Sequence, residues 1–292
     1  MISQNFKIDI CKKTRKIAKD TLLKTLKDVL SSNKRTSEAD LRDLWLNEMR
    51  KNSNLFSDGW YIPPPHGLIV LFGSDKKVER LDLKSARPKN MWPKKNTFLD
   101  RENGLISVYA SPIDRSSGII GDFGLTIYLG KKKKIQDHLR NVFDINKKVF
   151  SKIEIGMKLS DVSKFYLEIT SKKRLVNDVS SLSDPMGTNI GHSIPGVYDK
   201  WTQREKGKFK KGKSTDVANT ISKKRFYVND SSKVKIQPGL AFTIEARLKS
   251  SEDDEIPQAY FHTIATIREN GQRELFTDFD EIFKLTKMNY IN

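Results

Sequence analysis

Three ionisable side chains, Asp122, His192 and Glu245, each stand alone in an apolar, strand-like run of this sequence. The three runs cover residues 118–130, 190–195 and 240–246. A carboxylate in such a run is costly to bury unless a cation or hydrogen-bond donors compensate it. An isolated aspartate more often caps a turn or pairs with a lysine, but an acid, an imidazole and a second acid could also converge on one metal ion. The sequence therefore contains a candidate metal site, which its secondary structure must assemble.

Apolar periodicity predicts the elements of the N-terminal half. Two helices open the chain, one from about Ile8 to Leu30 and one capped by Ser37 with Asp40 three residues later. A strand follows at 68–72, and residues 105–130 are predicted to form a β-hairpin whose second arm carries Asp122. Residues 74–103 are expected to be irregular, and 135–150 helical.

The C-terminal half is predicted to be richer in strands. Ser160 is expected to cap a helix, and short strands are expected at 175–179 and around His192 and Glu245. A hairpin of 258–267 and 274–276 closes the chain. Residues 199–233 are polar, with the lysine-rich segment 204–213 at their centre, and are predicted to be a mobile surface loop.

Composition bounds the class of protein. The chain has 292 residues, of which 37% are hydrophobic, which suffices for one large domain or two halves that share a sheet. Its formal net charge of +18 favours attraction to polyanions. One cysteine excludes an intrachain disulfide and indicates a reducing compartment. No apolar run reaches the roughly 18 residues of a membrane span, so the protein is predicted to be cytoplasmic, with no membrane partner.

The order of these motifs resembles the methionine aminopeptidase/creatinase family. The motifs that carry the resemblance are Gly118–Gly130 around Asp122, Ile153–Met157, Gly191-His192-Ser193-Ile194, Pro238–Glu245 and Gln258–Thr263. The resemblance covers nearly the whole chain and implies an α+β pita-bread (creatinase/aminopeptidase) fold, a pseudo-two-fold curved antiparallel sheet with flanking helices. It further implies a single domain over 1–292, with halves of about 1–150 and 151–292.

The ligand set departs from that family's pattern. The family holds two metal ions with two aspartates, one histidine and two glutamates, and only Asp122, His192 and Glu245 match. Its first aspartate should fall at residues 109–111, where no acid stands, and its last glutamate falls on Phe261. The resemblance therefore implies at most one divalent ion, and two carboxylates with one imidazole suit Mn, Fe, Co or Zn. A protein that holds no metal is the other outcome.

Two further histidines are candidate catalytic residues. His262 follows Phe261 directly, so on a regular strand it would face the opposite side, although a bulge could turn it inward. A packed or surface histidine is the more common interpretation of that position. His66 follows three prolines and lies near the place where the family keeps a substrate-facing histidine, which makes it a candidate for proton transfer or substrate contact.

Three functions fit this pattern. The first is a metal-dependent hydrolase that cleaves a C–N bond in a peptide-like or amino-acid-derived small substrate. The second is a diverged enzyme of small-molecule metabolism with non-peptidase chemistry. The third is an inactive pita-bread module that binds a protein or polyanion; nucleic acid is not the favoured partner, since sequence-specific readout is not indicated. The oligomeric state stays open, with a homodimer among the options.

Overall fold

The computed structural model describes residues 3–82, 84–177, 184 and 186–291. Two helices come first, and the strands are divided among three small sheets. The elements in chain order are α1 (Gln4–Ser31), α2 (Glu38–Arg50), a 3₁₀ turn at Pro65–Gly67, β1 (Leu68–Ser74), a 3₁₀ turn at Lys89–Met91, β2 (Gly104–Ala110), β3 (Phe123–Tyr128), α3 (Lys133–Lys152), α4 (Leu159–Lys172), β4 (Leu175–Asn177), α5 (Gln203–Lys211), α6 (Ser214–Lys224), β5 (Ala241–Ile244), β6 (Leu248–Ser250), β7 (Thr263–Ile267), β8 (Arg273–Phe276) and α7 (Asp280–Leu285).

Every strand pairing in these sheets is antiparallel. One three-stranded sheet has the order β1-β2-β3, a second has the order β5-β7-β8, and β4 pairs with β6. An isolated antiparallel bridge between Leu125 and Phe261 joins β3 to the start of β7. This bridge brings the two three-stranded sheets together, although β3 and β7 are far apart in the sequence.

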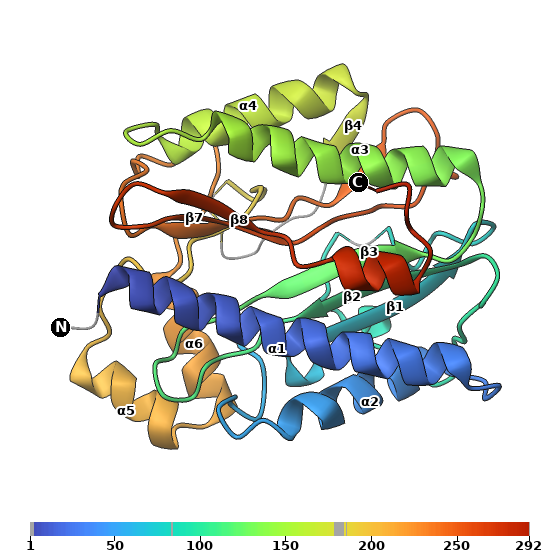
Figure 1. Cartoon of the computed structure of the whole chain (residues 1–292), viewed down its shortest axis with the longest axis horizontal. Coiled ribbons are helices and arrows are strands. Elements are labelled where there is room, and N and C mark those ends of the chain that lie inside the picture. Colours follow the sequence, from blue (N-terminus) through green and yellow to red (C-terminus); the bar gives the residue numbers. More distant parts are fainter. Residues whose placement is uncertain (1–2, 83, 178–183, 185, 292) are drawn as a thin grey trace.

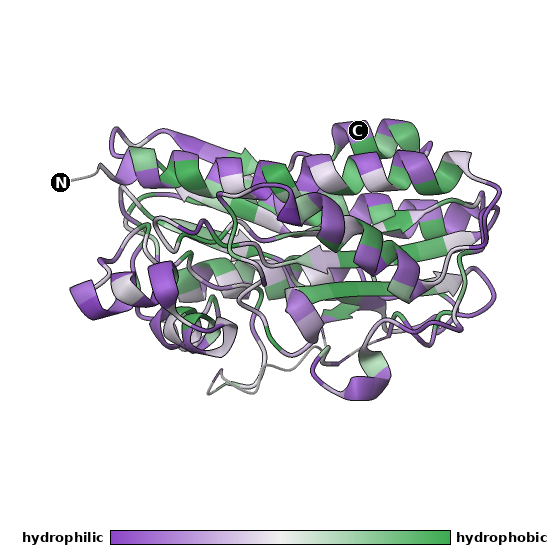
Figure 2. Ribbon diagram, turned by 90° about the horizontal axis from the view of Figure 1, so that it is seen from below, coloured by the Kyte–Doolittle hydropathy of each residue, from purple (hydrophilic) through white to green (hydrophobic). Residues whose placement is uncertain are grey.

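Helices flank the strands on both sides. In Figure 1, α3 and α4 run across the top of the molecule, α1 and α2 run across the bottom, and the strands lie between them. Both α1 and α3 contact β3, and α1 packs on α2 as α3 packs on α4. Figure 2 shows why the helices pack on the strands. The strands are mostly hydrophobic, whereas the helices alternate between hydrophilic and hydrophobic residues, as expected of elements with one buried face. The predicted α+β class is confirmed.

The opening helices follow their capping signals. The Ser37 hydroxyl accepts a hydrogen bond from the Asp40 backbone N–H (3.1 Å), and the Asp40 carboxylate accepts one from the Ser37 N–H (2.9 Å), as predicted. The first helix begins at Gln4, four residues before its predicted start. The predicted cap at Ser160 is wrong, because α4 starts at Leu159 and the Asp161 carboxylate instead accepts from the backbone N–H of Lys158.

The prediction of a mobile loop over 199–233 is also wrong. Thr202 and Glu205 form a reciprocal capping box that starts α5, and α6 follows after two residues. The buried side chains of these helices, Phe209, Val217 and Ile221, pack in a cluster that includes Trp60 and Trp201. The lysine content obscured this pattern, because apolar residues occur only on the inner faces. Of the predicted strand at 175–179, the last two residues lie outside the described part.

The apolar core extends through both halves of the chain. The larger buried cluster joins α1 and α2 to the sheet of β1–β3 and continues through α3, α4 and α7. Within the described residues, no helix combines the length and the apolar character needed to cross a membrane.

Candidate metal centre

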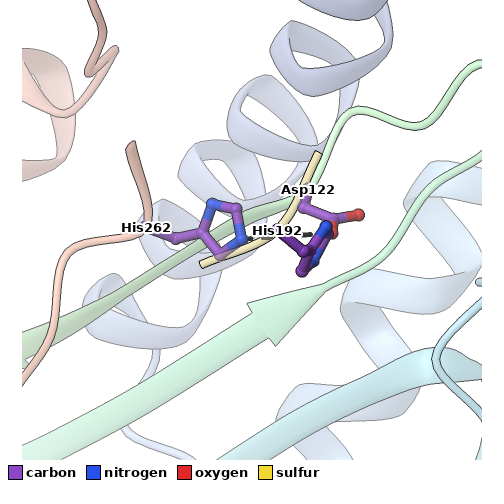
Figure 3. A group of neighbouring side chains, drawn as sticks. All are labelled: Asp122, His192 and His262. Carbon is purple, nitrogen blue, oxygen red and sulfur yellow. Dashed lines mark ion pairs between the residues drawn. The ribbon is translucent and has the colours of Figure 1, made fainter. Parts of the chain in front are cut away.

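The structure brings together the three predicted ligands Asp122, His192 and Glu245, and adds His262 to them. The His192 Nε2 atom lies 3.5 Å from Asp122 Oδ2 and 3.3 Å from Glu245 Oε1. The His262 Nε2 atom lies 2.9 Å from Glu245 Oε2 and 3.9 Å from Asp122 Oδ2. Figure 3 shows Asp122, His192 and His262 pointing toward one another, and their ligand atoms all lie within 4.8 Å of each other.

Strand register explains this convergence. Asp122 comes one residue before β3, Glu245 one residue after β5, and His262 one residue before β7. Because β5 and β7 are antiparallel with Ile244 opposite Thr263, the next residues along each chain, Glu245 and His262, face each other. The His262 backbone N–H also donates to Gly124 O (2.9 Å), which places it beside the start of β3.

Two donors orient the buried Asp122 carboxylate. The Trp60 indole Nε1–H donates to Oδ1 (2.7 Å), and the Tyr109 hydroxyl donates to Oδ2 (3.1 Å). Burial, followed by the neighbouring Asp122 and Glu245 charges, raises the pKa of the Tyr109 phenol well above its usual value, so it remains a donor. Oδ2 is therefore the oxygen that faces the imidazoles, while Oδ1 is committed to Trp60.

His192 is held by both its backbone and its ring. Its N–H donates to the Thr243 hydroxyl (2.8 Å), while its ring Nδ1 lies 2.9 Å from Ser193 O. A carbonyl can only accept, so Nδ1 carries a proton and Nε2 is the nitrogen that faces the two carboxylates. A ring nitrogen fixed in this way is typical of a histidine that binds a metal ion. Gly191 permits the close approach, because a Cβ there would lie 2.0 Å from Thr243 O.

Glu245 is the ligand candidate that reaches solvent, with 22% of its side chain exposed. The Thr243 hydroxyl donates to its Oε1 (3.0 Å). Burial opposes its ionisation, but the neighbouring His262 and His192 rings, together with the Thr243 hydroxyl, outweigh burial and hold the pKa of Glu245 well below its usual range. Glu245 is therefore an anion at neutral pH.

His262 is fully buried and lies beside the three predicted ligands, so it is not a surface histidine. Strand alternation turns Phe261 the other way, into an aromatic cluster with Phe143, Phe279 and Phe283. Among the described residues, neither ring nitrogen of His262 has a hydrogen-bond partner of good geometry. The 2.9 Å approach to Glu245 is a close contact without the alignment of a hydrogen bond.

The buried Arg15 of α1 supports two of these residues through their backbones. Its guanidinium donates to Asp122 O, to His262 O (2.8 Å) and to Thr277 O (2.8 Å), and it pairs with Asp278 (3.2 Å). Helix α1 comes this close because residue 121 is glycine, where a Cβ would lie 2.3 Å from the Arg15 backbone nitrogen. Arg15 therefore ties the start of β3 to the start of β7.

Asp122, His192 and His262 lie close enough together to hold a single divalent ion, because one ligand atom from each falls within 4.8 Å of the other two. Glu245 borders this group through both of its oxygens, with Oε1 3.3 Å from His192 and Oε2 2.9 Å from His262. The unpartnered ring nitrogen of His262 supports the same conclusion, since a buried polar atom without a partner is costly. Two carboxylates and two imidazoles suit Zn, Fe, Co or Mn.

The structure does not bring His66 into this cluster. It sits just before β1 in the left-handed region (φ 60°), and its ring Nδ1 contacts Asp58 (2.7 Å) and Arg50 (3.3 Å). With Asp58 and Arg50 it lines a separate pocket between α2 and β1. Its catalytic role stays a prediction.

Four supporting residues were missed by the sequence reasoning, namely Trp60, Tyr109, Thr243 and Arg15. Thr243 lies in the motif of Glu245, so its position two residues away was a usable signal. Tyr109 occupies one of the positions where an acid was expected, and its hydroxyl contacts Asp122 instead. Trp60 and Arg15 had no sequence signal, because they reach Asp122 from distant segments.

Neither a protein-family profile nor a curated protein sequence matches the chain. Solved structures do match. The Xaa-Pro dipeptidase from Bacillus anthracis aligns over 94% of this chain and 61% of its own, with TM-score 0.62 and 15% identity. The prolidase from Pyrococcus furiosus aligns over 93% and 63%, with TM-score 0.59 and 13% identity. The methionine aminopeptidase from Rickettsia prowazekii aligns over 94% and 97%, with TM-score 0.61 and 16% identity.

The chain spans about three fifths of the length of the dipeptidase and prolidase structures, but almost the full length of the methionine aminopeptidase. Identities this low establish a shared fold. The resemblance predicted from the motif order is thereby confirmed at the level of the fold, and the chain has the pita-bread fold of methionine aminopeptidase and prolidase structures.

Proposed function

We propose that this protein is a metal-dependent hydrolase that cleaves a C–N bond in a peptide-like or amino-acid-derived small substrate. One divalent ion would be held by Asp122, His192, Glu245 and His262. The proposal thus moves His262 from the predicted catalytic role to the ligand set. The fold is that of peptidase structures, but the proposal depends on this chain's own side chains, because fold alone does not set function.

One observation carries the proposal. The Nε2 atom of His192, whose proton sits on Nδ1, faces two carboxylate oxygens at 3.3 and 3.5 Å. Three lone-pair-bearing atoms repel one another unless a cation lies between them or the imidazole gains a second proton. A divalent ion satisfies all three atoms and also engages the unpartnered ring of His262.

The protein's own groups divide the remaining work. A divalent ion held by these residues would supply Lewis-acid chemistry for the substrate carbonyl and a water reactive at neutral pH. Trp60 and Tyr109 hold the Asp122 carboxylate in one orientation, and Thr243 does the same for Glu245. Glu245 is the partly exposed member of the set, so the substrate would approach from its side.

The finer architecture belongs to the same proposal. Residues 1–292 would form one domain in which halves of about 1–150 and 151–292 are related by a pseudo-two-fold axis. The three-stranded sheets β1-β2-β3 and β5-β7-β8, one from each half, support this division. Asp122 comes from the first half, and the other three ligand candidates come from the second.

Metal content and activity test the proposal together. Purified protein would be stripped with a chelator, reloaded separately with Mn²⁺, Fe²⁺, Co²⁺ or Zn²⁺, and assayed on Xaa-Pro dipeptides and on peptides with N-terminal methionine. We expect hydrolysis with at least one metal, and its loss in His192→Asn and Asp122→Asn. Glu168→Gln on the outer face of α4 is the control, since its exposed carboxylate pairs with Lys172.

A folded protein that takes up none of these metals would overturn the proposal. The cluster would then be an ion-pair network of imidazolium and carboxylate groups. Stoichiometric metal without hydrolysis of any peptide would retain the metal site and exclude peptides as the substrate.

A further inference from the structure

Helix α5 and the residues just after it carry a lysine-rich surface. Between residues 203 and 213 the chain carries Arg204, Lys206, Lys208, Lys210, Lys211 and Lys213. The single acid in this stretch, Glu205, is engaged by the Thr202 cap and by Lys224. Helix α3, by comparison, interleaves its lysines with Asp137 and Asp144 and pairs several of them.

Most of these cations are exposed and unneutralised. Arg204, Lys206, Lys210, Lys211 and Lys213 are exposed, and among the described residues no carboxylate forms a salt bridge with them. The positive charge also affects Lys7 on α1, whose pKa is lowered chiefly by burial. Asp199 opposes this lowering, while Lys200 and Lys206 add to it. We call the surface formed by Arg204, Lys206, Lys210, Lys211 and Lys213 the α5 basic face.

The α5 basic face is rigidly mounted. The apolar residue of α5, Phe209, is buried against Trp201 (ring centroids 4.8 Å apart), and α6 packs beside it through Val217 and Ile221. The Ser214 hydroxyl at the start of α6 also donates to the Asp58 carboxylate (2.5 Å), which lines the pocket beside His66. Figures 1 and 2 show the two helices at one end of the molecule, with α5 almost entirely hydrophilic. These contacts anchor α5, and its exposed cations project from two adjacent flanks, Lys206 with Lys210 and Arg204 with Lys211.

We propose that the α5 basic face binds the phosphate backbone of a nucleic acid duplex without reading its sequence. Exposed lysine and arginine side chains bind phosphates through charge, and such contacts carry no sequence specificity. A protein partner is disfavoured because interface cores are depleted in lysine and need apolar or aromatic anchors, which this face lacks. Insertion into a lipid surface is disfavoured as well, since an interfacial helix needs an exposed apolar face. Single-strand binding would need exposed aromatic rings for base stacking.

A charge-matched pair of variants tests this surface. The test variant is Lys206→Gln/Lys210→Gln/Lys211→Gln, because glutamine preserves helix propensity. The control is Lys148→Gln/Lys152→Gln/Lys164→Gln, which removes the same charge from exposed lysines on α3 and α4, at the opposite edge of Figure 1. Binding to a labelled 24-base-pair DNA duplex, and to the RNA duplex of the same sequence, is followed by fluorescence anisotropy from 50 to 300 mM KCl.

We expect wild-type affinity to fall steeply with salt, and the test variant to lose about 2 to 3 units of the log–log slope, since each phosphate contact contributes about 0.9. The control should keep the wild-type slope. An equal loss in both variants would show that only net charge acts, and absence of binding at 50 mM KCl would reject the site. Binding of the α5 basic face to anionic vesicles but not to duplex would assign it to a membrane instead. All measurements use chelator-treated protein, so failure here leaves the proposed hydrolase untouched.

Discussion

Asp122 is the residue on which the candidate site depends, because both oxygens of its carboxylate have defined partners. Trp60 holds Oδ1, and Tyr109 holds the Oδ2 atom that faces the two imidazoles. Supporting partners of this kind orient a metal ligand, and their loss typically weakens metal affinity about 10- to 100-fold. The residue scale therefore offers direct tests that leave all four ligand candidates in place.

Trp60→Phe should lower divalent-metal affinity about 10- to 100-fold, because the Asp122 carboxylate loses the donor that fixes its orientation. It should also lower the free energy of unfolding by about 1–3 kcal/mol. Isothermal titration calorimetry and urea unfolding measure the two effects. Trp201→Phe is the matched control, since Trp201 lies in the same apolar cluster but its buried indole N–H has no partner among the described residues. Equal losses of metal affinity in both variants would contradict the role given to Trp60.

Arg15→Met should destabilise the protein by about 3 kcal/mol, because breaking a buried ion pair leaves polar groups without partners. It exposes the carbonyls of Asp122, His262 and Thr277 to an apolar neighbour. Weaker metal binding should accompany the lower stability, since two ligand candidates lose their shared support. Arg15→Lys keeps the charge but not the planar geometry of the guanidinium. Compared with Arg15→Met, it should recover part of the lost stability and a smaller part of the lost metal affinity. Full metal affinity in Arg15→Met would show that Arg15 supports only the fold.

At the scale of elements, α3 braces the strands that carry the site. The Asn146 side-chain amide on α3 donates to Phe261 O (2.7 Å), beside His262. About two turns earlier, His138 on the same helix hydrogen-bonds the backbone of Leu248 and Pro257, and its Nε2 has no partner among the described residues. Helix α3 thus holds the loops around the second half of the site through buried polar groups.

His138 predicts how stability depends on pH. Burial lowers its pKa from 6.5 to about 4, and the backbone hydrogen bonds only partly oppose this. Between those two pH values the unfolded chain binds a proton at His138 that the folded chain does not. The contribution of His138 to the free energy of unfolding is therefore fully present above pH 6.5 and is lost as the pH falls to about 4. A shift of this size corresponds to about 3 kcal/mol. Urea unfolding of wild type and His138→Leu from pH 7 to 4 should show the wild type losing more stability, and parallel losses would refute the prediction.

Elements with strong local signals were predicted from sequence, and those set by long-range packing were not. The capping box at Ser37 and the hairpin carrying Asp122 are local patterns, and both are present. Helices α5 and α6 were missed because each buries only a few side chains among many lysines. The inward turn of His262 depends on the register between β5 and β7, which the sequence alone does not specify.

At the scale of the whole molecule, the candidate centre joins the two halves of the chain. Asp122 precedes β3 of the first sheet, whereas Glu245 and His262 border the paired strands β5 and β7 of the other. An ion held by all of them would link these sheets in the folded state and bind weakly to the unfolded chain. Metal binding should therefore appear as global stability.

A divalent metal at 100 times its dissociation constant should raise the free energy of unfolding by about 2.7 kcal/mol. Urea unfolding with and without the metal that binds best, in chelator-treated protein, measures the difference. Asp122→Asn should show a much smaller shift, and an equal shift in that variant would place the bound metal elsewhere.

Metal stoichiometry in wild type and in His262→Asn tests the central claim most directly. Equilibrium dialysis followed by elemental analysis should find one ion per wild-type chain, and affinity reduced at least about 10-fold in His262→Asn. His66→Asn, at the histidine that lies apart from the cluster, should bind like the wild type. Two ions per chain, no ion, or unchanged affinity in His262→Asn would contradict a single centre built from Asp122, His192, Glu245 and His262.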